Sequence, residues 1–180
     1  DEFVLVGLSI GGMWGVELAR MAPARLKGLV LMDSFVGLEP QITCERYLGM
    51  LAMIEQLGTI PAPIVEQVAP LFFADQPDAD LMSGFKARLA AWPADKVAAM
   101  VAVGRSFVTR EDRIEWLEEM AVPALVMTGS QDKARPVLEG YLMAEVLGCP
   151  FREIPAAGHI ASLENPAFVN EQLGAFLAAL

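Results

Sequence analysis

Three side chains in this sequence of 180 residues could together activate a nucleophile: Ser9, Asp132 and His159. A neutral serine is a poor nucleophile, but an imidazole can take its proton, and a carboxylate can orient the imidazole and stabilise its charged form. His159 is the only histidine in the chain, so it has no rival as the base. The residue types therefore predict nucleophilic catalysis by Ser9, with His159 as the base and Asp132 as the acid.

The serine stands in the pattern Gly7-Leu8-Ser9-Ile10-Gly11, between an apolar run and a helix-compatible run. A strand that turns this sharply into a helix holds the serine in a strained conformation with its hydroxyl exposed. Side chains two residues before and two after the serine would collide, so glycine suits both positions. The amide of Ile10 would face negative charge that develops beside the serine, as in an oxyanion hole. The alternative is a glycine-rich turn that packs or binds phosphate, but Ser9 stands where a dinucleotide motif needs its second glycine.

The elements around these residues predict an α/β fold. Short apolar runs predict buried parallel strands, and runs with helical spacing separate them. The predicted strands are 3–7, 26–32, 122–128 and 150–154, and the predicted helices between and after them are 12–22, 135–147 and 166–180. Because the carboxyl ends of parallel strands share one edge of a sheet, we expect Ser9, Asp132 and His159 to meet there.

The acid has a second candidate in Asp33. This aspartate ends the strand that follows the serine's helix, so it is expected at the same edge of the sheet. The order serine, acid, histidine along the chain favours Asp132, which precedes the histidine loop by one strand. Asp33 is then an alternative acid or a carboxylate that caps the end of its strand.

A helical insertion separates the second and third strands, from Ser34 to about Met120. It is far longer than an ordinary connection, and large insertions at the active edge of a sheet often act as lids or substrate pockets. The sequence thus predicts three segments: 1–33 and 121–180 in the sheet domain, and 34–120 as a cap. The predicted cap helices are 41–57, 63–73, 79–91, 94–108 and 113–119. Large apolar side chains that either line a pocket or pack the insertion's own core are Met50, Met53, Phe72, Phe73, Trp92, Met100, Phe107 and Trp116.

Composition excludes several classes of function. The net charge of −10 argues against binding to nucleic acid or to an anionic membrane surface. No apolar stretch reaches the roughly 18 residues that span a bilayer, and no signal peptide is visible. A single histidine and two cysteines without a C-x-x-C pattern make a metal site unexpected. We therefore expect a cytoplasmic protein with no metal, no cofactor and two free thiols.

The motifs together resemble those of the α/β-hydrolase superfamily. They are the serine turn, the run Leu29-Val30-Leu31-Met32-Asp33, the segment from Val122 to Asp132 ending in Gly129-Ser130-Gln131-Asp132, and Gly158-His159 followed by Leu163-Glu164-Asn165-Pro166. The closest resemblance within the superfamily is to capped esterases, enol-lactonases and cofactor-free haloperoxidase-type enzymes. It implies hydrolysis of small carboxylic esters or lactones through an acyl-serine intermediate. A serine rather than an aspartate at the turn argues against a haloalkane dehalogenase or an epoxide hydrolase.

The resemblance also implies that the chain corresponds to the C-terminal part of the family's sheet. Relatives have strands before the serine's strand and a His-Gly loop that supplies a second oxyanion amide. Without them, only the Ile10 amide is expected in the oxyanion hole, and the loss of one such donor typically lowers the rate by ~10²–10³. The strand at 3–6 would also be an apolar edge, so we expect a further N-terminal segment or a second chain to complete the sheet.

Two other functions stay open from the sequence. A perhydrolase of the haloperoxidase type would use the same three residues with peroxide as the acceptor. A catalytically silent hydrolase fold used for binding would fit the absent oxyanion loop, although such a scaffold has no need for all three residues.

Overall fold

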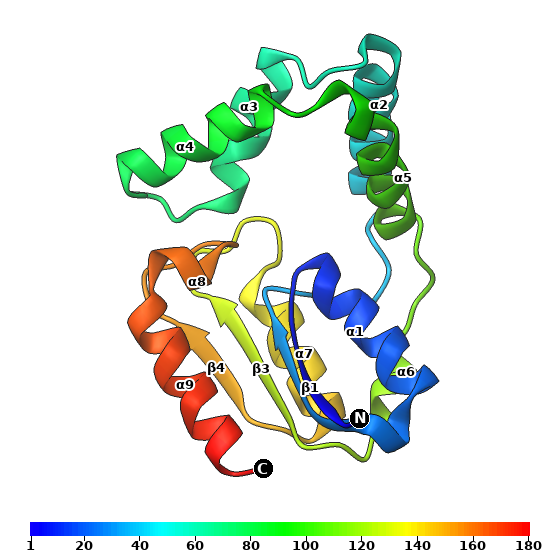
Figure 1. Ribbon diagram of the computed structural model, residues 1–180, viewed down its shortest axis with the longest axis vertical. Helices are drawn as coiled ribbons and strands as arrows, with labels where there is room; N and C mark the ends of the chain where they lie inside the picture. Colours follow the sequence, from blue (N-terminus) through cyan, green and yellow to red (C-terminus); the bar gives the residue numbers. More distant parts are fainter. The chain divides into compact units, whose positions relative to one another are not determined.

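Four parallel strands form one sheet, and they lie side by side in the order in which they follow one another along the chain. The computed structural model describes residues 1–180. The strands are β1 (Phe3–Leu8), β2 (Leu26–Met32), β3 (Ala124–Gly129) and β4 (Phe151–Ile154). All four predicted strands are confirmed within two residues at each end. Figure 1 shows that their arrowheads point to the same edge of the sheet, the edge at which Ser9, Asp132 and His159 follow their strands.

Helices cover both faces of this sheet. On one face lie α1 (Ile10–Met21), α6 (Ile114–Glu118) and α7 (Val137–Leu147), and on the other lie α8 (Ala161–Glu164) and α9 (Pro166–Ala178). Alternate side chains of β2 divide between the two faces, as the two-residue period of a strand requires. Leu29 and Leu31 pack in the core with α1, α6 and α7, whereas Val30 and Met32 pack in the core with α8 and α9. The predicted α/β class with helices on both faces is confirmed.

The helices of the sheet domain follow the predicted order with small differences. Helix α1 begins at Ile10, two residues earlier than expected, because Ser9 is its N-terminal flanking residue. Helix α9 begins as predicted from the Asn-Pro pair, since the side chain of Asn165 accepts the backbone N–H of Phe168 at 3.3 Å. Helix α8 was not predicted, because its four residues are too few to show helical spacing.

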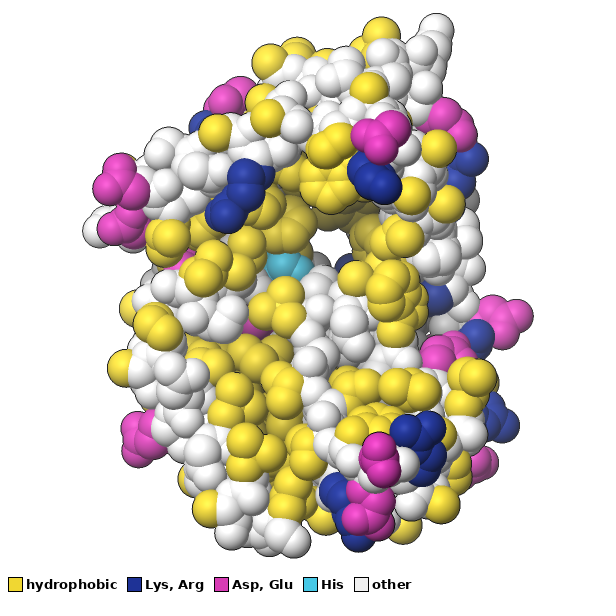
Figure 2. Space-filling model, viewed as in Figure 1, with side chains coloured by type: hydrophobic (Ala, Val, Ile, Leu, Met, Phe, Trp, Pro, Cys, Tyr) yellow, Lys and Arg dark blue, Asp and Glu magenta, His cyan; other side chains and the backbone are white.

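The first strand lies at an open edge of the sheet. β1 pairs only with β2. Val6 on this strand is 47% exposed, and α1 beside it carries exposed apolar side chains at helical spacing, Trp14, Leu18 and Met21. On the face drawn in Figure 2, hydrophobic side chains gather over β1 and α1. The predicted apolar edge is therefore present.

The chain divides into two compact units. The sheet unit comprises Asp1–Val36, Leu71–Gln76 and Arg113–Leu180, and the helical unit comprises Gly37–Pro70 and Pro77–Asp112. The helices of the second unit are α2 (Gln41–Leu57), α3 (Ala62–Val68), α4 (Ala79–Ala90) and α5 (Val97–Val108). Three short 3-10 turns connect these elements. One lies before β2 (Pro23–Arg25), one follows α3 (Ala69–Phe72) and one precedes α5 (Ala94–Lys96).

The helical unit has its own core and its own buried ion pair. Leu51 and Ile54 of α2 pack with Val97 and Val101 of α5 and with α3. Arg110 donates to Glu39 at 2.7 Å, and both side chains are almost completely buried. No helix in either unit is both long and apolar enough to cross a bilayer.

Candidate active site

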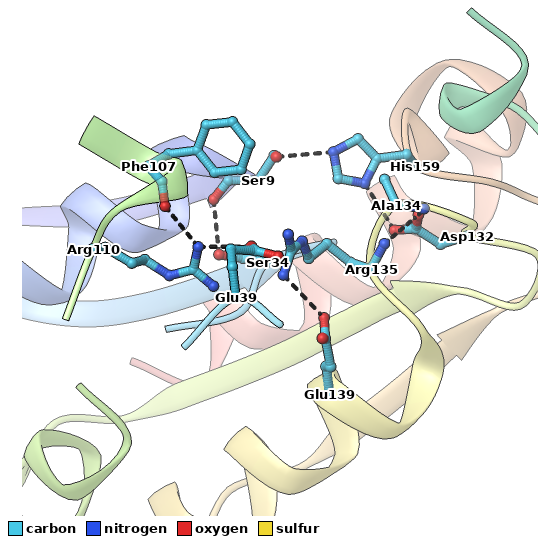
Figure 3. A network of polar contacts seen from close by, with 10 residues as sticks. All are labelled: Ser9, Ser34, Glu39, Phe107, Arg110, Asp132, Ala134, Arg135, Glu139 and His159. Carbon is cyan, nitrogen blue, oxygen red and sulfur yellow. Dashed lines mark hydrogen bonds and ion pairs between the residues drawn. The ribbon is translucent and has the colours of Figure 1, made fainter. Parts of the chain in front are cut away.

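The three residues singled out by their chemistry meet at the carboxyl edge of the sheet. Ser9 lies between β1 and α1, Asp132 follows β3, and His159 follows β4. The Oγ of Ser9 lies 2.8 Å from Nε2 of His159, and Nδ1 of the same imidazole lies 2.8 Å from Oδ2 of Asp132. Figure 3 shows the serine and the imidazole pointing toward one another, with Asp132 on the other side of the ring. With its proton on Nδ1, His159 donates to Asp132 and can accept the hydroxyl proton of Ser9.

The backbone of Ser9 has the strained conformation that a sharp strand-to-helix turn requires. Its φ is +53° and its ψ is −121°, a region that residues with side chains rarely adopt. The N–H of Ser9 donates to the carbonyl of Met32 at 2.8 Å, and the hydroxyl of Ser34 donates to the carbonyl of Ser9 at 2.7 Å. These two bonds tie the turn to the end of β2, so they hold a conformation that the serine would not keep by itself.

Close packing explains two of the glycines around the serine, but not the pair that was predicted. A Cβ on Gly7 would lie 2.5 Å from the carbonyl oxygen of Gly11, so the expectation for Gly7 is confirmed. A Cβ on Gly11 would meet nothing within 4 Å, so the expectation for that position is wrong. The second close approach is at Gly12, where a Cβ would lie 2.6 Å from the hydroxyl of Ser34. The close approach of β1 to α1 thus leaves no room for a side chain at Gly7, and the segment that follows β2 leaves none at Gly12.

The amide of Ile10 is at the position expected of an oxyanion donor. Ile10 is the first residue of α1, so its N–H has no acceptor within the helix. The N–H groups of Gly12 and Met13, later in the first turn of the helix, already donate to the carbonyl of Ser9. The role of Ile10 in binding an oxyanion stays a prediction.

Asp132 receives N–H donors on both oxygens of its carboxylate. Its Oδ1 accepts the backbone N–H groups of Ala134 and Arg135, at 2.8 and 2.9 Å, and its Oδ2 faces His159. The side chain of His159 is almost completely buried and Asp132 is 8% exposed, whereas Ser9 is half-buried. The carboxylate is thus fixed with one oxygen toward the imidazole, and the hydroxyl stays partly open to solvent.

Asp33, the alternative acid, makes no hydrogen bond with His159 in this arrangement. Its side chain is fully buried, and its Oδ1 accepts the backbone N–H of Gly129 at 2.7 Å. Burial raises the pKa of Asp33 from 3.8 to about 8; the Gly129 bond acts in the opposite direction, and the neighbouring charges of Asp132 and Glu164 add to the increase. Like Ser9, Asp33 has a positive φ, of +46°.

The loop that carries His159 is held by residues whose roles the sequence did not predict. The carboxylate of Glu164 accepts the N–H of Gly158 at 2.7 Å and the N–H of Ala74 at 2.9 Å. The ring of Phe72 meets the imidazole edge to face, with 5.1 Å between the ring centroids, and its carbonyl accepts the N–H of Ile160 at 3.1 Å. Of the apolar residues expected to line a pocket or a core, Phe72 is thus a neighbour of the predicted base.

Comparison with known proteins gives the evolutionary setting of this geometry. The model of the alpha/beta hydrolase family matches residues 1–172. The 3-oxoadipate enol-lactonase 2 of Acinetobacter baylyi is 23% identical over 176 residues, which are 95% of this chain and 62% of that protein. A thermophilic esterase from Thermogutta terrifontis, solved with malate bound, has a TM-score of 0.87 and 25% identity over 99% of this chain and 65% of its own.

A further solved structure shows the same fold. BpoC from Mycobacterium tuberculosis, provisionally assigned as a non-heme bromoperoxidase, has a TM-score of 0.80 and 23% identity over 98% of this chain and 66% of its own. The chain thus spans slightly less than two thirds of the lactonase and of the esterase. The resemblance inferred from the motifs is confirmed by a family match that covers nearly the whole sequence: the chain belongs to the alpha/beta hydrolase family.

Proposed function

We propose that this protein is a serine hydrolase that cleaves small carboxylic esters or lactones. The observation that carries the proposal is the pair of 2.8 Å contacts that link Ser9 to His159 and His159 to Asp132. The names of two relatives, an enol-lactonase and an esterase, support the same class of substrate. A lactone is a cyclic carboxylic ester, so both names fall within one class of reaction.

The proposed reaction has two steps. In the first, Ser9 Oγ bonds to the ester carbonyl carbon while its proton passes to His159 Nε2, and Asp132 stabilises the imidazolium. The carbon–oxygen bond of the ester then breaks, and the leaving alkoxide takes the proton from His159, which leaves an acyl-serine. In the second step, water gives a proton to His159 and attacks the acyl carbon, so that the carboxylic acid departs and Ser9 Oγ recovers its proton. In a lactone the alcohol stays tethered to the acyl group.

The oxyanion of each tetrahedral intermediate would bind to the Ile10 amide at the N-terminus of α1. Two features favour an active site over a silent scaffold: Ser9 is half-buried rather than enclosed, and its hydroxyl is within hydrogen-bond distance of the imidazole. We also propose that the helical unit acts as the cap that selects the acyl or alcohol group. Perhydrolysis uses the same three residues with peroxide in place of water, so an assay for peroxide-dependent halogenation separates it from hydrolysis.

The test is covalent labelling with a fluorophosphonate probe, followed by intact-mass spectrometry. We expect one adduct in the protein with its natural sequence and none in Ser9→Ala, because only a hydroxyl with an adjacent base reacts rapidly with the probe. Ser106→Ala is the matched control and should label like the natural protein, since it removes an exposed serine hydroxyl that donates to the carbonyl of Val103 within its own helix. The absence of any adduct in the natural protein would favour the silent scaffold.

We further propose that another β-strand pairs with the open edge of β1. The support is the exposed apolar surface of β1 and α1, together with the length of the relatives, which exceeds that of this chain by about half. An unpaired apolar edge strand tends to pair with another chain. We expect the 180-residue chain to self-associate in analytical ultracentrifugation and to be monomeric when such a strand is supplied. A stable monomer whose β1 amides exchange rapidly with solvent would contradict this proposal.

A further inference from the structure

Asp33 is a buried carboxyl group that the proposed reaction does not use. Its side chain is fully enclosed, and only one of its oxygens is satisfied, since Oδ1 accepts the N–H of Gly129. Its Oδ2 has no N–H or O–H donor. An ionised carboxylate oxygen without a donor is costly inside a protein, and the group avoids that cost by binding a proton.

The carboxyl group of Asp33 lies against that of Asp132. The two aspartates share Gly129, whose N–H donates to Asp33 and whose carbonyl accepts the N–H of Asp132 at 3.1 Å. The charge of Asp132 and a side-chain hydrogen bond with it both raise the pKa of Asp33. Two adjacent buried carboxyl groups cannot both be ionised at modest cost, so one proton is shared between them or held by one of them.

The hydrogen bonds decide which of the two holds the proton. Asp132 accepts two backbone N–H groups at Oδ1 and faces the imidazole at Oδ2, and N–H donors stabilise an ionised carboxylate. Asp33 has a single N–H donor. The other charged groups nearby do not reverse this order: the negative charge of Glu164 opposes ionisation of Asp33, and the guanidinium of Arg135 is bound to Glu139 at 3.3 Å.

We propose that Asp33 is a protonated positioning residue whose Oδ2–H donates to the carboxylate of Asp132 and holds it toward His159. The proposal rests on the site described under the proposed function, but it concerns a proton and can be tested without any turnover. The extra hydrogen bond would fix Asp132 without placing a second negative charge beside it. The pKa of Asp33, raised by burial to about 8, agrees with a neutral carboxyl group at pH 7.

The single histidine makes this proton observable by NMR. We compare the pH titration of the imidazole Cε1–H signal in the natural protein and in Asp33→Asn, whose amide can accept from Gly129 and donate to Asp132 as the protonated acid would. We expect the main titration midpoint to be the same in both, because the substitution exchanges one neutral group for another. We also expect a second inflection near pH 8 in the natural protein only, where Asp33 loses its proton.

The opposite result has a distinct signature. If Asp33 is ionised at neutral pH, Asp33→Asn removes a negative charge near the imidazole, and the midpoint falls by about one pH unit. That fall, without an inflection near pH 8 in the natural protein, would overturn the proposal. Asp75→Asn is the matched control, because it removes the charge of an aspartate whose side chain is 73% exposed, and solvent screens such a charge.

Two further measurements keep the proposal testable if Asp33→Asn does not fold. In the natural protein labelled with ¹³C-aspartate, one carboxyl signal should titrate near pH 8 rather than near 4. The contribution of Asp33 to the free energy of unfolding should also fall as the pH rises from about 4 to about 8, since the folded protein retains on this group a proton that the unfolded chain has released. If every aspartate signal titrates below pH 6, Asp33 does not hold the proton. Labelling of Ser9 by the fluorophosphonate could still succeed in that case, so the two proposals fail separately.

Discussion

Replacing His159 by glutamine is expected to slow the reaction of Ser9 with a fluorophosphonate by about 10²- to 10⁴-fold, the usual contribution of a general base. Glutamine is similar in length and can still hydrogen-bond to the serine, but its amide cannot take the hydroxyl proton. Because His159 is the only histidine, no neighbouring imidazole can replace it. The rate constant of labelling, measured by mass spectrometry over a range of probe concentrations, gives the loss directly.

Asp132, the residue that faces His159, provides the matched comparison for His159→Gln. Asp132→Asn keeps the size of the side chain, but its amide would present either a donor or a neutral oxygen to Nδ1 of His159. The imidazole could then carry its proton on Nε2, where it could not accept the proton of Ser9. We expect a loss of labelling rate of about the same order. If His159→Gln labels within tenfold of the natural protein, the imidazole is not the base, and the proposed function is wrong.

The arrangement of the site was predictable where it depends on strand ends. Ser9, Asp132 and His159 each follow an apolar run, and a parallel sheet brings the carboxyl ends of such runs to one edge. The same reasoning identified Asp33 as a neighbour of the site. The order along the chain favoured Asp132 as the aspartate that faces the imidazole. It could not exclude Asp33, because the answer depends on the paths of two loops. The structure brings Asp132 to His159 and leaves Asp33 beside Asp132.

The hydrogen bonds and packing contacts that hold the site residues in place could not be predicted from sequence patterns. The bond from Ser34 to the carbonyl of Ser9 depends on the register of β1 against β2. Glu164 joins Gly158, six residues away, to Ala74, ninety residues away, and no spacing rule relates a carboxylate to so distant an amide. Close packing between segments that are apart in the sequence cannot be predicted from spacing either, and for this reason Gly11 was expected to be crowded, whereas the crowded position is Gly12, which faces the side chain of Ser34.

Replacing Gly129 by alanine is expected to destabilise the fold by about 3 kcal/mol, which corresponds to a decrease of roughly 6–12 °C in the unfolding temperature. Gly129 is the last residue of β3, and a Cβ there would overlap the carbonyl oxygen of Gly158 and lie 2.5 Å from that of Ala157. Both obstacles are backbone atoms, so no side chain can rotate away. The segment that must move is the loop that carries His159.

Gly129→Ala should therefore weaken the chemistry as well as the fold. A displacement of about 1 Å between reacting groups can cost about 10²-fold in rate, so we expect labelling of Ser9 to slow by that order at a temperature where the variant is folded.

Gly174→Ala is the matched control, because it lies on an exposed turn of α9 where a Cβ meets nothing within 4 Å. That variant should be more stable by about 0.5–1 kcal/mol, since alanine favours a helix over glycine, and it should label at the natural rate. If Gly129→Ala unfolds at the same temperature as the natural protein and labels as fast, the histidine loop is not held against the end of β3. The separation between Ser9 and His159 must then be maintained by other contacts of the loop, among them those of Glu164, Phe72 and Asp132.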